Sequence, residues 1–217
     1  MLVRNRMSQP AITVHPDTSL QDALGLMHAE RVRRLPVVDR KGKLVGIVSE
    51  RELLKASPSI ATTLSKFEIK EAIKDLKIKE FMSTGVATVT ENTPVEEAAR
   101  IMVDGQISGL PVVRDDEVVG VITETDIFKV FLEIFGARQP GIRVAFLLSQ
   151  APGQLATVST AIAKAGGNLI ALGSFLGETS KNVEITMKID SMEQQEVVDI
   201  LTPLVEKILD IRKMSII

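Results

Sequence analysis

The fold of this chain is decided by a stretch that occurs twice, as Leu35-Pro36-Val37-Val38 and again as Leu110-Pro111-Val112-Val113. The copies are 75 residues apart, and other matches share this offset. These are Met7-Ser8 with Met82-Ser83, Thr13-Val14 with Thr88-Val89, and Met27 with Met102. Beyond a hairpin tip that is one residue shorter in the second copy, Val45-Gly46-Ile47-Val48-Ser49 matches Val119-Gly120-Val121-Ile122-Thr123. The chain therefore contains an internal duplication, which constrains the architecture more than any single motif does.

Each copy predicts the same succession of elements. A short strand leads into a helix with one apolar stripe, two β-branched runs form a hairpin, and a second helix closes the unit. A capping box is predicted at each first helix, starting at Thr18 and at Thr93, with Pro94 as the first helical residue of the second copy. The other predicted ranges are 11–14, 35–39, 44–49 and 50–55 in the first copy, and 86–90, 110–114, 118–123 and 124–135 in the second.

One such βαββα unit has too little apolar surface to close a core, so the two copies are expected to pack together with pseudo-twofold symmetry. We therefore predict one domain over residues 1–138, with a first repeat at about 2–57, a linker at 58–78 and a second repeat at about 79–135. Within the linker, residues 67–73 predict a charged helical stretch that shields the pair.

Charge and composition exclude several classes of function. The 26 basic and 28 acidic residues give a net charge of -2, so neither nucleic acid nor an anionic membrane is an expected partner. Cysteine is absent and there are only two histidines, so we expect no metal site and a reducing cytoplasmic location. The sequence contains no apolar run long enough for a membrane span. It also lacks the common catalytic motifs, so we expect no enzyme.

A second domain is predicted over residues 142–217, after a helix-breaking stretch at 136–141. Its order of strand, helix, strand, strand, helix, strand suits a ferredoxin-like βαββαβ sandwich, which places the whole chain in the α+β class. The predicted strands are 142–148, 168–175, 182–189 and 208–215, and the predicted helices are 154–165 and a second that starts near 191–194.

The duplicated residues resemble CBS motifs, named for cystathionine beta-synthase. The resemblance covers about residues 2 to 135 and is carried by Met-Ser before the first strand, Leu-Pro-Val-Val in the second, and the ending Gly120-Val121-Ile122-Thr123-Glu124-Thr125-Asp126. It implies an adenosine-type ligand in clefts between the two motifs. Such a ligand would be AMP, ADP or ATP, with S-adenosylmethionine or NADH as alternatives, and it would require no metal.

The resemblance assigns roles in one cleft residue by residue. Thr123 approaches phosphate, Asp126 binds the ribose hydroxyls, and Ile12 and Ile122 line the adenine. The chemistry agrees, because a helix start offers free N–H groups to phosphate and a carboxylate can accept two hydrogen bonds from vicinal hydroxyls. By the same resemblance, the partner motif adds Arg33-Arg34 at the phosphate. Adjacent strand residues face opposite ways, which leaves open whether one or both take part.

The sister cleft departs from the family pattern. Its residues would be Ser49, Glu52, Ala87 and Ser108. Glu52 replaces the aspartate and moves the carboxylate out of register for ribose, and Ser108-Gly109 stand where the arginines would be. We expect one competent site and one that is weak or empty. A structural alternative stands beside both clefts, because Ser49 with Glu52 and Thr123 with Asp126 also fit helix caps that need no ligand.

The second domain is similar to an ACT domain. Pro152-Gly153-Gln154-Leu155 matches that family's Pro-Gly-x-Leu turn, and Gly166-Gly167-Asn168 matches its Gly-x-Asn. Such domains often pair side by side and bind an amino acid near the turn glycine and the asparagine, here Gly153 and Asn168. The family's acidic residue before the turn is missing in Ser149-Gln150. This favours the alternative that the glycine only permits a tight turn and the domain serves dimerisation.

A CBS pair followed by an ACT domain resembles the acetoin utilization protein B group of bacterial proteins. The combination predicts a cytoplasmic homodimer that senses a nucleotide without catalysis and could signal to a regulated protein that the sequence does not identify. Two alternatives are a purely structural dimerisation module and a receptor for a cyclic dinucleotide.

Overall fold

The computed structural model describes residues 1–56 and 76–215. It divides into two compact units, Met1–Ile127 and Phe128–Ile217, and each is described by itself. The predicted bounds of the two domains remain a prediction. The predicted charged helix at 67–73 and most of the predicted linker lie outside the described residues.

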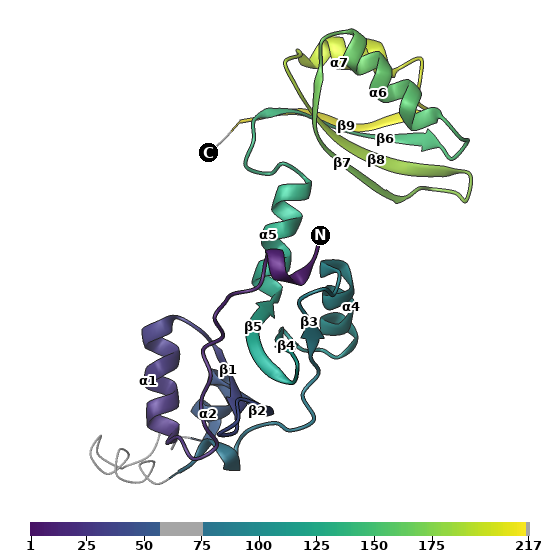
Figure 1. Ribbon diagram of the computed structural model, residues 1–217. Coiled ribbons are helices and arrows are strands. Elements are labelled where there is room, and N and C mark those ends of the chain that lie inside the picture. The colour runs from purple at the N-terminus through teal and green to yellow at the C-terminus, as the bar shows by residue number, and fades with distance from the viewer. Residues whose placement is uncertain (57–75, 216–217) are drawn as a thin grey trace. The chain divides into compact units, whose positions relative to one another are not determined.

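The first unit contains the two repeats, and its hairpins are where the sequence predicts them (Figure 1). The first repeat has α1 (Leu20–Glu30), β1 (Arg34–Val38), β2 (Leu44–Ser49) and α2 (Glu50–Ala56). The second has β3 (Val89–Thr90), α4 (Val95–Asp104), β4 (Gly109–Arg114), β5 (Glu117–Thr123) and α5 (Glu124–Ile134), whose later part belongs to the second unit. Both hairpins are antiparallel and change register at equivalent places, between Val37 and Val38 and between Val112 and Val113. The duplication therefore extends to the irregularities of the strands.

The predicted first strands are shorter in the structure. Residues 11–14 form only a single parallel bridge, Val14 with Val37, and β3 has two residues beside β4. Both capping predictions were wrong in position. The N-caps are Ser19, which accepts from Asp22 N–H, and Pro94, which has no side-chain hydrogen bond.

The predicted cap threonines have another use. The Thr18 hydroxyl oxygen accepts the His15 N–H at 3.2 Å, and Thr93 accepts the Thr90 N–H at 3.1 Å. Each threonine therefore closes the turn before its helix, and this engages the oxygen that a cap would need.

Each repeat completes its core with a segment from in front of the other. Val3 and Met7 of the segment around η1 (Val3–Asn5) are buried in the core of the second repeat, and Ile78 of η2 (Ile78–Glu80) is buried in that of the first. Backbone bridges join Ser8 to Val121 and Ser83 to Ile47. This exchange ties the two repeats together, and an offset in sequence cannot reveal it.

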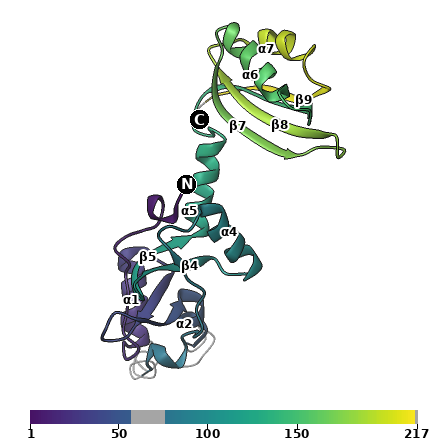
Figure 2. The same cartoon turned by 45° about the vertical axis from the view of Figure 1, so that its right-hand side comes forward.

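The second unit is a four-stranded antiparallel sheet with two helices. The elements are β6 (Gly141–Ser149), α6 (Gln154–Lys164), β7 (Asn168–Leu176), β8 (Asn182–Asp190), α7 (Gln194–Leu201) and β9 (Lys207–Met214). The strand order is β7-β8-β6-β9, and α6 and α7 lie on the same face of the sheet in both views (Figures 1 and 2). Their core contains Phe146, Val158 and Val197. The predicted order of elements is confirmed, and it is that of a ferredoxin-like sandwich.

Among the described residues, no helix has the length and apolar character that crossing a membrane requires.

Candidate functional site

A hydrogen-bonded pair closes the second repeat where β5 runs into α5. The Thr123 N–H donates to Asp126 Oδ2 at 3.0 Å, and the Thr123 hydroxyl donates to the same oxygen at 2.7 Å. Asp126 is only 6% exposed. A buried carboxylate needs such donors, because an unpaired charge in the interior is costly. The geometry is that of a helix cap, and it holds the carboxylate in the first turn of α5.

The first repeat has the equivalent pair at the start of α2. Glu52 Oε2 accepts the Ser49 N–H at 2.8 Å and the Ser49 hydroxyl at 2.6 Å. Its other oxygen, Oε1, accepts the Ser83 hydroxyl at 3.2 Å. Both oxygens of Glu52 are therefore engaged within the protein.

Of the two arginines where the first hairpin begins, Arg34 turns inward and Arg33 outward. Arg34 is half-buried, whereas Arg33 is exposed. Arg34 Nη1 donates to the Ser108 carbonyl oxygen at 3.3 Å, and Nη2 donates to the Ser108 hydroxyl. Burial lowers the pKa of the Arg34 guanidinium, and the carboxylate of Glu124 opposes that shift. Arg34 is thus the arginine that reaches the second repeat.

We give the name central cluster to five residues from the two repeats, Arg34, Ser108, Gly109, Thr123 and Asp126. The Ser108 carbonyl oxygen that accepts from Arg34 also accepts the Glu124 N–H at 3.3 Å. A Cβ built on Gly109 would lie 3.5 Å from Thr123 Cγ2 and 3.7 Å from Arg34 Cδ. The guanidinium from the first repeat therefore lies beside the first turn of α5 in the second.

Three predicted cleft residues have other surroundings. Ile122 is fully buried in the core of the second repeat, because its side chain alternates inward opposite Leu110 on β4. Its side chain is covered in this structure, and its contact with an adenine ring stays a prediction. Ile12 packs against the core of the first repeat, and Ala87 is exposed.

The two residues predicted for a ligand of the second domain lie at opposite ends of its sheet. Gly153 has a φ of +86° and caps α6, just beyond Ser149, which pairs with Asn182. Asn168 begins the edge strand β7 and pairs with Asp190 at the other end. One chain therefore does not bring Gly153 and Asn168 together.

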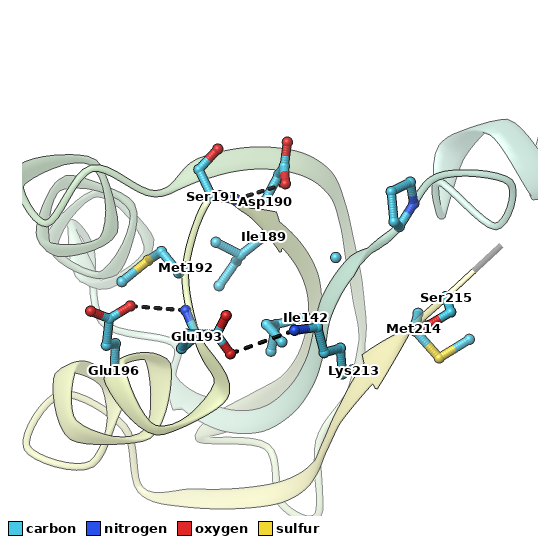
Figure 3. A pocket seen from close by; sticks show the side chains of 12 residues that line it. Ile142, Ile189, Asp190, Ser191, Met192, Glu193, Glu196, Lys213, Met214 and Ser215 are labelled. Carbon is cyan, nitrogen blue, oxygen red and sulfur yellow. Dashed lines mark hydrogen bonds and ion pairs between the residues drawn. The ribbon is translucent and has the colours of Figure 1, made fainter.

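Sequence reasoning missed a cavity of about 540 Å³ at that other end of the sheet (Figure 3). Its walls come from the start of β6, the end of β8, the start of α7 and the end of β9, so no local motif could point to it. The Glu193 carboxylate forms an ion pair with Lys213 Nζ at 3.5 Å, and the Glu193 N–H donates to Glu196 Oε2 at 2.8 Å. The residues that line the cavity are Pro140, Gly141, Ile142, Ile189, Asp190, Ser191, Met192, Glu193, Glu196, Lys213, Met214 and Ser215.

In residues 1–56 and 76–215, no three histidine or carboxylate side chains are grouped to hold a metal ion.

Comparison with known proteins identifies relatives of the first unit. The family model of the CBS domain matches residues 3–59 and 78–133, just over half of the chain. A CBS domain-containing protein of Dictyostelium discoideum is 31% identical over 135 residues, which cover 62% of this chain and 93% of that protein. The L-aspartate semialdehyde sulfurtransferase of Methanocaldococcus jannaschii is 35% identical over 131 residues, but only 23% of its length is matched.

Solved structures of similar pairs include ligand complexes. The CBS domain pair of protein MJ0100, in complex with 5′-methylthioadenosine and S-adenosyl-L-methionine, has a TM-score of 0.51 and 33% identity, covering 64% of this chain and 98% of that one. A Vibrio cholerae protein described as an acetoin utilization protein (AcuB) has a TM-score of 0.52 and 32% identity with the same coverage. CBSX2 in complex with AMP has a TM-score of 0.50 and 29% identity, covering 61% and 97%.

Proposed function

Because the chain belongs to the CBS domain family, we propose that it is a non-catalytic regulatory protein that binds an adenosine-type nucleotide between its two repeats. The observation that carries this proposal is the central cluster, in which a cation from one repeat lies beside the capped helix start of the other. Similar CBS pairs in complex with AMP, or with methylthioadenosine and S-adenosylmethionine, support the class of ligand.

In this proposal, Thr123 and the N–H groups at the start of α5 bind phosphate, and Asp126 binds the ribose hydroxyls. Phosphate suits a helix start because the backbone N–H groups there point toward an anion and the helix dipole favours negative charge. Asp126 is 6% exposed, and its carboxylate already accepts from Thr123. A ribose must therefore displace atoms that cover it, and binding would favour a second packing of the two repeats.

The sister cleft is proposed as the weaker one. Glu52 uses one oxygen for Ser49 and the other for Ser83, so a ribose there would have to break contacts on both oxygens. By the family resemblance, the partner motif also gives that cleft Ser108 and Gly109 where the first has Arg33 and Arg34.

For the second unit we propose an ACT domain that serves dimerisation, with the whole chain acting as a cytoplasmic homodimer. The βαββαβ order and the β7-β8-β6-β9 sheet support that assignment. A role in acetoin utilization is supported by the likeness to the Vibrio cholerae protein. The regulated partner would be another protein that responds to the packing of the repeats.

Titration calorimetry on the full chain tests the proposal directly. The ligands are AMP, ADP, ATP, S-adenosylmethionine, NADH and cyclic di-AMP, and we expect saturable heat with at least one adenosyl compound. Absence of heat from all of them, with circular dichroism showing folded protein, would falsify nucleotide sensing.

A structural role without ligand is the second candidate, and the Thr123 to Asp126 hydrogen bonds favour it because they complete a cap on their own. A melting temperature that stays constant with every nucleotide, together with a dimer in analytical ultracentrifugation, is the result expected for this role.

A further inference from the structure

A row of basic side chains crosses the sheet of the second unit. Arg143 on β6 is the direct cross-strand partner of Lys188 on β8 and of Arg212 on β9. Partners that lie directly opposite one another in an antiparallel sheet have their side chains on the same face, with Cβ atoms about 5 Å apart. These three residues, which we call the basic row, therefore stand side by side on adjacent strands.

The basic row lies on the face of the sheet opposite to α6 and α7 (Figure 2). Arg143 alternates along β6 with Ile142 and Val144, which are both buried in the core beneath the two helices. The side chains of Arg143 and Arg212 are 37% and 63% exposed. Solvent therefore reaches the row at its arginine end.

Lys188 forms the buried end of the row. It is 4% exposed, and its Nζ donates to the Gly136 carbonyl oxygen at 2.8 Å. An ammonium group has three donors, and this is the only hydrogen bond or ion pair that the Lys188 side chain makes within the described part of the chain. Asp190 and Glu184 share its face of β8, but neither forms an ion pair with it. A buried cation with only a neutral partner is costly.

A single carboxylate contacts the two arginines of the row. Asp210 Oδ2 accepts Arg143 Nη1 at 2.7 Å and Arg212 Nε at 3.0 Å. Each guanidinium has five N–H donors, so Asp210 leaves part of both unused. The three basic groups of the row therefore have one acidic group in direct contact.

Lys188 and Arg143 bind acceptors on opposite sides of the row. Lys188 contacts the turn after α5, where a Cβ built on Gly136 would lie 3.5 Å from Ala171 Cβ on β7. Arg143 contacts Asp210 on β9. Like charges directly opposite one another on neighbouring strands repel, and an anion between these two side chains would remove that repulsion.

We propose that the second unit binds a small multivalent oxyanion, a phosphate or a polycarboxylate, between Lys188 and Arg143, with Arg212 at its outer side. The proposal does not rest on nucleotide binding in the first unit. A guanidinium binds phosphate or carboxylate through two parallel N–H···O bonds, and an ammonium group adds a compact charge. A multivalent anion is favoured over a monovalent one because it compensates more than one of the three basic groups.

Titration calorimetry on the full chain tests the proposal, without nucleotide and with chloride as the only other anion. The probes are sodium phosphate, sodium citrate and sodium acetate at constant ionic strength. We expect saturable binding of phosphate or citrate, and binding of acetate that is at least about tenfold weaker, the effect of losing a charge-assisted hydrogen bond. The lower Kd of phosphate or of citrate assigns the class of anion. No saturable binding of either would overturn the proposal.

Two variants locate the anion. Arg143→Gln and Lys188→Met are each expected to weaken binding of the tighter anion at least about tenfold, because each removes a charged donor. Arg40→Gln is the matched control, since Arg40 is an exposed arginine of the first unit, and it should change the affinity by less than about twofold. Unchanged affinity in both row variants would overturn the proposal.

Hydrogen exchange separates an anion site from a purely structural row. With the anion at ten times Kd, exchange that requires opening of the second unit should slow about tenfold in wild type, and by much less in Lys188→Met. This difference between samples with and without anion is a readout that a structural role would not produce. Should Arg143→Gln not fold, Lys188→Met alone decides. Protection confined to the first unit would overturn the proposal.

Discussion

Asp126 has two uses for one carboxylate. In the cap it accepts two hydrogen bonds from Thr123, and in the proposed cleft the same group binds ribose. Glu52 makes the same kind of cap with Ser49, and its second oxygen is engaged by Ser83. Comparing Asp126 with Glu52 therefore separates helix capping from ligand binding, because only Asp126 is proposed to do both.

We predict that Asp126→Ala and Glu52→Ala each lower the free energy of unfolding by about 1 kcal/mol, the usual effect of losing a cap. Asp126→Ala should also weaken nucleotide binding at least about tenfold, as expected for losing hydrogen bonds to a charged group. Glu52→Ala should leave the affinity within about threefold. Urea denaturation and calorimetry measure the two quantities, and equal losses of affinity in both variants would contradict the assignment of the competent cleft.

Lys188 is a buried cation on β8, 4% exposed, whose Nζ donates to the Gly136 carbonyl oxygen at 2.8 Å. Burial lowers its pKa below the ordinary 10.5. Between the lowered pKa and 10.5, the unfolded chain binds a proton that the folded chain does not. The free energy of unfolding should therefore rise with pH across that window.

We predict that Lys188→Met removes this rise, whereas Lys181→Met, at an exposed position, keeps it. Denaturant titrations at several pH values up to 10.5 measure the slope. A slope that Lys188→Met leaves unchanged would place its origin elsewhere.

At the scale of elements, local sequence patterns predicted most of the helices and strands. Contacts between elements that are distant in sequence were not predicted. The hairpins β1-β2 and β4-β5 and the second unit follow from β-branched runs and turn residues that act over a few positions. The caps shifted because Thr18 and Thr93 hydrogen-bond the preceding turns. The exchange of the leading segments depends on packing between residues about 100 positions apart in sequence, such as Val3 and Ala98, which no local pattern encodes.

Two equivalent glycines receive the exchanged segments. A Cβ at Gly120 would lie 2.7 Å from Met7 Sδ and 2.9 Å from the Ser8 carbonyl oxygen, and one at Gly46 would lie 2.7 Å from Met82 Sδ and 3.0 Å from the Ser83 carbonyl oxygen. The sulfur can move, but the backbone oxygen belongs to a bridge that joins the segment to the hairpin. These positions therefore require glycine for close backbone approach.

We predict that Gly120→Ala lowers the free energy of unfolding by about 1–3 kcal/mol, as overpacking does. Gly25→Ala is the control, because Gly25 lies within α1 with open space around its Cβ position. That change should raise stability by about 0.5–1 kcal/mol. Chemical denaturation measures both, and a neutral Gly120→Ala would argue against the exchanged segment.

At the scale of the molecule, the site could be predicted only in part. Thr123 and Asp126 are three residues apart and were found from the sequence as a cap or a cleft. The contact of Arg34 with Ser108 was not found, because the two residues are 74 positions apart and meet only when the repeats pack. The choice between Arg33 and Arg34 likewise needed the strand to be placed, and the cavity beside Glu193 needed the whole sheet.

We predict that a nucleotide stabilises the first unit and not the second, because the proposed cleft lies within residues 1–127. At a ligand concentration of 100 times Kd the gain is about 2.7 kcal/mol. Hydrogen exchange resolved along the chain should show slower exchange in β5 and at the start of α5, with β6 to β9 unchanged. Uniform protection of both units would indicate a different binding site.

A crystal structure of the full chain grown with saturating AMP is the most direct measurement. If a nucleotide binds at the central cluster, we predict electron density for a ribose at the Asp126 carboxylate and for a phosphate between Thr123 and the Arg34 guanidinium. The guanidinium would then have left Ser108. An unchanged Thr123 to Asp126 cap with no ligand density, at a concentration where calorimetry reports saturation, would contradict it.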